Sequence, residues 1–225
     1  MHLPRLRGDG SAAVSPLATL VRAANPGPMT LDGTNSWVLR APGSGRVVVV
    51  DPGPSIAEHL ERLAGFGEVE LVLLTHHHPD HSESLSEFAR LTDAPVRAID
   101  PAFCIDAPPL VDGERIRAAG LDLDVLATPG HTADSVSFVL PGDGDHGSVL
   151  TGDTILGLGT TIIADPDGAL GPYLEPLRAV HEVVVGDDAT VAQVTDLVYV
   201  DTDAAVRPAA EASVRAQLVY LRGRA

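Results

Sequence analysis

Residues 71–84 read LVLLTHHHPDHSES, in which an aliphatic run leads directly into four histidines and one aspartate within six positions. The aliphatic part predicts a buried strand over residues 69–75. In an extended segment alternate side chains face the same way, so His76 and His78 are expected to project together while His77 points elsewhere. Two imidazoles on one side of a strand end would form half of a metal site.

Asp80 and His81 follow where the chain turns into the next helix, which can aim a carboxylate and a third imidazole into the same space. Neutral nitrogen and carboxylate oxygen together are the donors that zinc and related metals favour. A solvated polar loop is the competing interpretation, because surface histidines are common. The HxHxDH spacing directly behind a buried strand favours the metal site.

Two later clusters can supply further ligands. ATPGHTADS, residues 127–135, carries His131 in a Pro-Gly turn between two expected strands, where the glycine allows a tight bend. VLTGDT, residues 149–154, ends an expected strand with Asp153. Each signal is weak alone, since such residues are usually solvated or cap an element. Their order along the chain completes the predicted metal site.

The rest of the chain alternates short apolar runs with glycine and proline, which predicts a mixed α and β domain without repeats. SWVLR and RVVVV predict a hairpin, and SIAEHLERLA predicts a helix with a serine cap. Further helices are expected over 82–91 and 171–181, and further strands over 121–128, 134–140, 148–153 and 182–185. Helical spacing beyond this point predicts a small helical module over 189–225, after a domain of residues 1–188.

Composition narrows the function. The 225 residues are long enough for one domain with a small appendage. The chain has 31 acidic residues against 15 basic ones, all arginine, and a formal charge of -16, which disfavours a general polyanion binder. The single cysteine, Cys104, fits a reducing compartment, so a cytoplasmic location is expected. Neither a signal peptide nor a membrane-spanning run is predicted.

The motifs NPGPMTLDGTNSWVL, VVVVDPGP, THHHPDH, TPGHT and TGDT together resemble the metallo-β-lactamase superfamily of binuclear hydrolases. The resemblance covers most of residues 17–185 and implies an α/β fold, a four-layer αββα sandwich with the metals at one edge of two sheets. By this similarity one metal is held by His76, His78 and His131, and a second by Asp80 and His81, with Asp153 bridging them. Asp51 matches a position that supports the site from behind.

Within the superfamily, the loop NPGPMTLDGTN, LGLGTT and the helical tail look most like endoribonuclease-type β-lactamase-like proteins, whose C-terminal module is winged-helix-like. The resemblance implies a metal-dependent hydrolase, because a bound metal such as Zn2+ lowers the pKa of its water to about 7 and so generates hydroxide. Asp80 is the expected catalytic residue, orienting the nucleophile and moving its proton. The expected substrates are small-molecule esters or thioesters, or single-stranded RNA as a phosphodiester.

The last ligand of the family is a histidine in a Pro-Gly-His-Gly turn, which is missing between Val185 and Ala189. His181 precedes the expected strand and is better interpreted as an ordinary residue at a helix end. The turn is either deleted or left out of the sequence. One firm metal and a weakened second site are therefore expected, with iron or manganese as alternatives to zinc.

Two alternatives to an active hydrolase remain. The first is a catalytically impaired metal-binding protein of the same fold, because of the missing histidine. The second is nucleic-acid binding through the C-terminal module, where four arginines and four acidic residues over 189–225 give a net charge of zero. That balance is thin for phosphate binding, and a packing or homodimer role is the better interpretation of the module.

Overall fold

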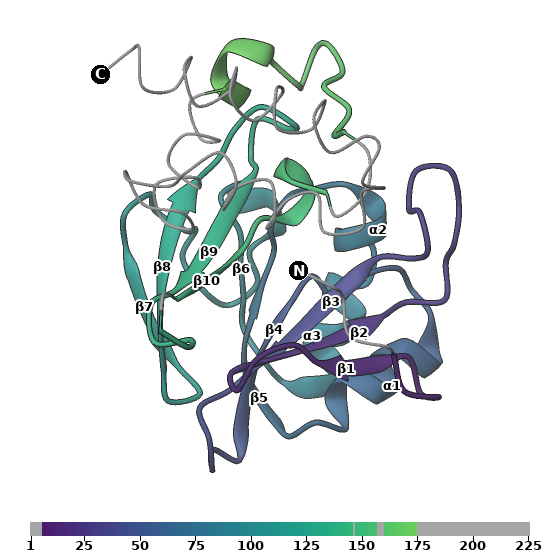
Figure 1. Cartoon of the computed structure of the whole chain (residues 1–225), viewed down its shortest axis with the longest axis vertical. Coiled ribbons are helices and arrows are strands. Elements are labelled where there is room, and N and C mark those ends of the chain that lie inside the picture. Colours follow the sequence, from purple (N-terminus) through teal and green to yellow (C-terminus); the bar gives the residue numbers. More distant parts are fainter. Residues whose placement is uncertain (1–5, 146, 157–159, 175–225) are drawn as a thin grey trace, which may run out of the picture.

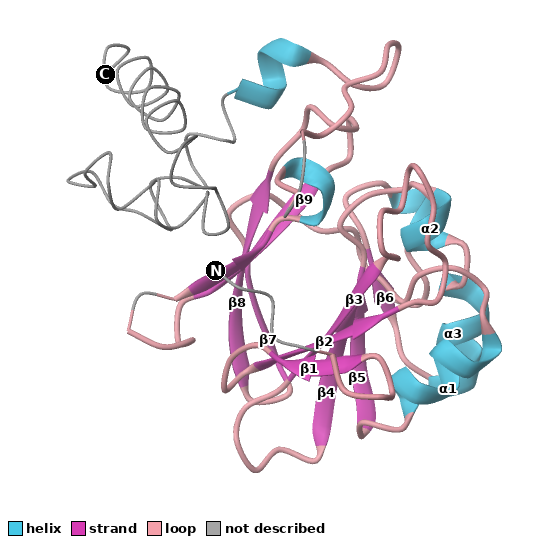
Figure 2. Cartoon of the chain, turned by 45° about the vertical axis from the view of Figure 1, so that its right-hand side comes forward, coloured by secondary structure: helices cyan, strands magenta, loops and turns pink. Residues whose placement is uncertain are grey.

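The computed structural model describes residues 6–145, 147–156 and 160–174. These residues form two β-sheets that face each other, with helices on the outer face of the larger sheet (Figure 1, Figure 2). The mixed α and β fold with two sheets is therefore confirmed. The larger sheet contains β1 (Ser11–Ala13), β2 (Ala18–Arg22), β3 (Asn35–Leu39), β4 (Arg46–Val50), β5 (Glu68–Leu73) and β6 (Val96–Arg97), and the smaller contains β7 (Arg115–Ala118), β8 (Leu121–Ala127), β9 (Val136–Leu140) and β10 (Ser148–Leu150).

The larger sheet keeps the chain order β1 to β6 and changes direction halfway. Its first four strands pair antiparallel, including the predicted hairpin of β3 and β4, whereas β4, β5 and β6 run parallel. Parallel neighbours need a crossover, which α1 (Ala57–Ala64) provides after β4 and α2 (Pro79–Ser82) with α3 (Leu85–Thr92) provide after β5. The smaller sheet is antiparallel throughout, in the order β10-β9-β8-β7.

The valine run of β4 divides its side chains between two cores. Val48 and Val50 pack between the sheets, against residues of the smaller sheet such as Phe138, while Val47 and Val49 pack under the helices. A strand buried on both faces needs apolar residues at every position, which explains why RVVVV lacks alternation. The same arrangement makes β5 the central support for the loop that follows it, because its residues also belong to both cores.

Two local predictions about the helices are wrong in detail. Helix α1 begins after Ile56 without a side-chain cap, because the hydroxyl of Ser55 donates instead to Glu87 of α3 (3.1 Å). The helix predicted over 82–91 begins later, as α3 at Leu85, and a separate short helix, α2, precedes it, so that Asp80 and His81 lie inside a helical turn. Four short strands, β1, β2, β6 and β7, have no counterpart among the predicted elements, since two to five residues carry little periodic signal.

The remaining expectations lie wholly or partly outside the described residues. The helix predicted over 171–181 begins at residue 170 and is described as far as residue 174. The strand over 182–185, His181, the missing turn and the module over 189–225 all lie beyond the described ranges, so the domain division stays a prediction. Within these ranges, no helix has both the length and the apolar character needed to cross a membrane.

Candidate metal centre

The loop after β5 carries the first two predicted ligands. Strand β5 ends at Leu73, so residues 75–78 lie in a loop and the strand pleat is not what directs their side chains. His76 and His78 nevertheless converge, with 3.1 Å between His76 Nε2 and His78 Nδ1. His77 points elsewhere and donates from Nδ1 to Asp134 Oδ1 (2.7 Å). The prediction that the His77 side chain points away from those of His76 and His78 is correct. The cause is the conformation of this loop and not strand alternation.

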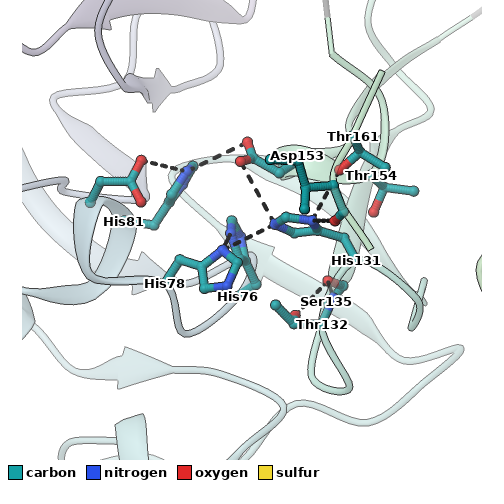
Figure 3. A network of polar contacts seen from close by, with 12 residues as sticks. His76, His78, His81, His131, Thr132, Ser135, Asp153, Thr154 and Thr161 are labelled. Atoms are coloured by element: carbon teal, nitrogen blue, oxygen red, sulfur yellow. Dashed lines mark hydrogen bonds and ion pairs between the residues drawn. The ribbon is translucent and has the colours of Figure 1, made fainter. Parts of the chain in front are cut away.

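The Pro-Gly turn between β8 and β9 brings in His131. Its Nε2 lies 3.0 Å from His78 Nδ1 (Figure 3). Gly130 adopts φ +144°, and a Cβ on it would lie 2.3 Å from Tyr173 Cα, so no other residue fits this turn without moving the segment after residue 160. The predicted need for glycine beside His131 thus has two causes, the backbone conformation and a close neighbour.

Asp153 enters the site from the end of β10. It lies on the short 3-10 helix η2 (Gly152–Thr154), and its carboxylate reaches toward both His81 and His131 (Figure 3). Gly152 has φ +50°, and a Cβ there would lie 2.7 Å from Thr75 Oγ1. Glycine therefore lets this turn approach the loop that carries His76.

His76, His78 and His131 form a group of three ring nitrogens, which we call the imidazole group. The two measured separations, 3.0 and 3.1 Å, compare with about 3.3 Å between ligands on a tetrahedral ion whose bonds are about 2.0–2.1 Å. A shift of a few tenths of an ångström would seat a metal ion. The donor set and its spacing therefore fit the divalent metals that bind imidazole.

The hydrogen-bond partners behind His76 and His131 leave free the ring nitrogens that face the other imidazoles. Thr75 gives its hydroxyl proton to Asp51 (2.6 Å), so it can only accept from His76 Nδ1 (3.0 Å), which leaves His76 Nε2 with its lone pair. His131 Nδ1 donates to the carbonyl of Ile162 (2.6 Å), which leaves Nε2 free in the same way. Such outer contacts fix the tautomer of metal-binding histidines.

His81, Asp80 and Asp153 form a second cluster, which we call the carboxylate group. His81 Nε2 lies 3.3 Å from Asp80 Oδ2 and 3.5 Å from Asp153 Oδ1, and Asp153 Oδ2 lies 3.8 Å from His131 Nε2. His76 also belongs to a possible ligand set with His81 and Asp153. Asp153 thus lies between the two groups, where the family resemblance expects a bridging ligand.

Asp51 supports the carboxylate group from behind. It is 2 % exposed, and it accepts hydrogen bonds from the Thr75 backbone (2.7 Å) and from His81 Nδ1 (2.9 Å). Its backbone adopts φ +53°, a conformation that costs a residue other than glycine energy and that surrounding contacts must hold. Asp51 therefore joins the end of β4 to both ligand-bearing segments, as the resemblance implies.

Several contributing residues carry no sequence signal of their own. Thr34 donates to Asp80 Oδ2 (2.8 Å), and Asn25 in turn holds Thr34 through both its amide atoms (2.9 and 3.0 Å). The Ile162 carbonyl is a backbone group and could not be found from residue type. Thr34 and Asn25 do lie in the motif NPGPMTLDGTN, which was the one available hint.

Electrostatics differ between the two groups, beginning with the imidazole group. Burial, followed by repulsion from other histidines, lowers the pKa of His76 well below its usual value. Burial and the neighbouring His131 lower the pKa of His78 in the same direction. These two rings are neutral at pH 7, which is the state in which imidazole binds a metal.

In the carboxylate group the balance is reversed. Burial opposes the charged form of His81, but attraction and hydrogen bonding by Asp51, with Asp80 and Asp153, raise its pKa to about 10. Burial also opposes ionisation of Asp80, yet hydrogen bonds and charge from His81 and a bond from Thr34 lower its pKa to about 2. Burial raises the pKa of Asp153. Three carboxylates gather around one buried imidazolium, an environment that favours a cation.

Comparisons with known proteins agree with this geometry. An atrochrysone carboxyl ACP thioesterase from Aspergillus fumigatus is 30% identical over 179 residues, covering 76% of this chain and 54% of that protein. A metallo-β-lactamase family protein from Thermus thermophilus has a similar structure, with a TM-score of 0.64 and 23% identity over 94% of this chain and 95% of that one. A protein solved in a di-iron-bound form has a TM-score of 0.54 and 22% identity over 70% and 85%. Likenesses at this identity establish the fold alone.

The chain spans about half the length of the curated relatives it matches. The finer likeness to endoribonuclease-type proteins and their winged-helix module stays a prediction, whereas the Aspergillus relative is a thioesterase. The Lactamase_B model, which describes the metallo-beta-lactamase superfamily, matches residues 29–208. Together with the two-sheet fold and the clustered histidines and aspartates, this match establishes that the chain belongs to the metallo-β-lactamase superfamily.

Proposed function

We propose that this protein is a metal-dependent hydrolase that cleaves thioesters, with zinc as its metal. The observation that carries the proposal is the convergence of His76, His78 and His131, in which His78 Nδ1 lies 3.1 Å from His76 Nε2 and 3.0 Å from His131 Nε2. The other ring nitrogens of His76 and His131 are held by hydrogen bonds. Gathering three imidazole rings this closely costs free energy, and a metal ion bound by all three would offset that cost.

The imidazole group would hold the first metal and the carboxylate group the second, with Asp153 serving both. A bound divalent metal supplies Lewis acidity and lowers the pKa of water toward 7. His81 would give up its Nε2 proton on binding, while Asp51 keeps the Nδ1 side of its ring fixed. Asn25 and Thr34 hold the Asp80 carboxylate from the other side.

Asp80 is our candidate for orienting the attacking water. Its pKa of about 2 makes it a carboxylate at neutral pH, so it accepts a hydrogen bond from water and is a poor store for a proton. Thr34 occupies Oδ2, which leaves Oδ1 for that contact. The water oxygen bonds to the thioester carbonyl carbon, the carbon–sulfur bond breaks, and the water's protons end on the carboxylic acid and the thiol.

The thioesterase relative supports a thioester as the substrate. The formal charge of -16 disfavours RNA, because such a chain repels a polyanion, and it favours thioesters only where these are not anionic themselves. The metal is proposed as zinc because imidazole with carboxylate suits it, although a neighbouring structure holds two irons, and iron accepts the same donors.

The proposal is tested with protein purified without added metal. We expect at least about one transition-metal ion per chain. We also expect hydrolysis of an acyl-coenzyme A or acyl-N-acetylcysteamine probe, which a chelator should abolish and added zinc should restore. A His131→Ala variant provides the matched loss of one ligand, and bis(p-nitrophenyl) phosphate tests the phosphodiester alternative.

Three results would change the proposal. A folded protein without metal, even after zinc is added, would refute the metal centre. Bound metal without turnover of either probe would support the impaired metal-binding protein, and turnover of the phosphodiester alone would replace the thioester as substrate class.

A further inference from the structure

His77 lies between two predicted ligands, yet its ring faces away from both and is not idle. Its Nδ1 donates to Asp134 Oδ1 at 2.7 Å, and this carboxylate oxygen also accepts the hydroxyl of Thr132 at 2.8 Å. Asp134 is 9 % exposed and lies three positions after His131, on the same turn. The bond therefore joins the loop of His76 and His78 to the turn of His131, which are 57 positions apart at the bonded residues.

His77 also contacts the other segments around the site. Its backbone carbonyl accepts the hydroxyl of Ser82 in α2, the helix that carries Asp80 and His81 (2.7 Å). Its Nε2 lies 3.7 Å from Asp167 Oδ2, and Asp167 Oδ1 accepts the backbone N–H of Ala133 (3.2 Å). Its ring lies against Phe103, with centroids 6.2 Å apart. One side chain thus meets the His131 turn, the segment after residue 160, and the body of the domain.

We infer that His77 and Asp134 are positioning residues, which hold the two ligand-bearing loops at the separation that the imidazole group needs. The inference rests on the proposed metal centre. The three nitrogens come from two loops, so their spacing depends on bonds between these loops. Among the described residues, two hydrogen bonds join these loops directly without involving a ligand ring. One is the backbone bond from Val136 N to Thr75 O (2.8 Å), and the other is the His77–Asp134 bond.

A positioning role differs from an ordinary surface ion pair in what it changes. The His77 side chain is 35 % exposed, and the Asp134 side chain, at 10 %, still accepts the Thr132 hydroxyl when the His77 ring is replaced, so its bonded oxygen is not left without a partner. Losing the pair should therefore change global stability little. It should weaken metal binding, because loops that are free to separate must be brought together again when the ion binds, and outer contacts of this kind are typically worth about 10–100-fold in metal affinity.

The test compares the zinc affinity and melting temperature of the wild-type protein with those of four single variants and one double variant. His77→Phe keeps a ring against Phe103 but removes the donor, His77→Gln restores a donor of similar reach, and Asp134→Asn weakens the acceptor. Arg115→Gln is the matched control, because it removes the exposed pair with Asp124 on β7 and β8. Zinc affinity is measured by competition with a chromophoric chelator, and melting temperatures are measured with and without zinc.

We expect His77→Phe to bind zinc about tenfold more weakly, at the lower end of the range for outer contacts, and His77→Gln to recover part of the loss. The double variant His77→Phe/Asp134→Asn should lose no more affinity than His77→Phe alone, since both changes act on the same hydrogen bond. The gap between melting temperatures with and without zinc should narrow. The control should match the wild-type protein in affinity.

Three outcomes would overturn the inference. Unchanged zinc affinity in folded His77→Phe, or equal falls of melting temperature with and without zinc, would mean that the pair is only structural. Failure of the wild-type protein to bind zinc would overturn the proposed metal centre, and the inference with it. Normal zinc binding by the wild-type protein with unchanged affinity in the variants would overturn the inference alone. If His77→Phe does not fold, His77→Gln and Asp134→Asn decide the matter by the same measurements.

Discussion

The imidazole group and the carboxylate group lie side by side, and His76 also belongs to a ligand set with His81 and Asp153, yet the imidazole rings of the two groups have opposite pKa shifts. Burial lowers the pKa of His76 well below its usual value, whereas the pKa of His81 is raised to about 10 although it is just as deeply buried. The difference lies in their neighbours. His76 faces other imidazoles, and His81 faces Asp51, Asp80 and Asp153.

This contrast shows that histidines adjacent in the sequence can belong to two sites with different protonation states. The imidazole group offers neutral lone pairs, which bind a metal without first losing a proton. The carboxylate group already holds one positive charge on His81, so a metal ion must displace a proton there. We therefore expect the two groups to differ in affinity and in pH dependence, as well as in their number of ligands.

The largest expected effect comes from His76→Ala, because His76 belongs to both possible ligand sets, one with His78 and His131 and one with His81 and Asp153. We expect metal affinity to fall more than 100-fold, beyond the about 10–100-fold loss typical of outer contacts, with loss of hydrolysis. Metal analysis after dialysis checks this, with Arg115→Gln as control. Metal content equal to that of the wild-type protein would show that His76 is not a ligand.

The second prediction concerns pH. Zinc titration of the metal-free protein should give one tight event that changes little between pH 7 and pH 9, because the pKa values of His76 and His78 lie below this range. A weaker event should strengthen about tenfold per pH unit, since rising pH removes the competing proton from His81, whose pKa is about 10.

Calorimetry in a chelator-buffered series measures both events. The missing Pro-Gly-His-Gly turn also predicts that the second event is the weaker one. Two equally tight events without pH dependence would contradict the comparison, and would require a further ligand for the carboxylate group.

A smaller effect is expected from Asp51→Asn, which has nearly the same shape without the charge. Asp51 holds His81 Nδ1, so the weaker zinc event should lose about 10–100-fold while the tight event changes less. The same titration measures this variant. Equal losses in both events would mean that Asp51 acts mainly through Thr75, which it also contacts.

The smallest effect concerns His59, a buried histidine without a carboxylate beside it, and bears on stability alone. Burial, with Arg62 nearby, lowers its pKa to about 4, and its Nε2 bonds Ser36 Oγ at 2.8 Å. A lowered pKa gives stability that is present above the unfolded value of 6.5 and is lost as pH falls through 4. Between pH 7 and pH 5 the loss is about 2 kcal/mol.

Urea unfolding of the metal-free protein at pH 5, 6 and 7 measures this loss. His59→Gln keeps an amide near Ser36 and cannot titrate in this range, so its stability should vary less with pH by that amount. Parallel pH curves for the two proteins would show that His59 titrates normally, and that burial alone does not explain the lowered pKa of His76.

Much of the fold was predictable because its signal is local. The hairpin of β3 and β4, strands β5, β8 and β9, and helix α1 follow from apolar periodicity within single segments. The short strands β1, β2, β6 and β7 are not predicted, because two to five residues carry little periodic signal. The predicted serine cap of α1 is absent because the Ser55 hydroxyl donates to Glu87 on another helix.

The sequence by itself determined which donors exist and in what order. Tertiary structure decided what these donors are for, because the contacts that set their charge and orientation cross long stretches of chain. Asp51 reaches His81 over 30 positions, Thr34 reaches Asp80 over 46, and His77 reaches Asp134 over 57. Local patterns describe which face of a segment is buried, whereas pKa values and ring orientations depend on atoms within a few ångströms. Strand pairing within the larger sheet brings some of those atoms together, and the packing of the two sheets brings the others.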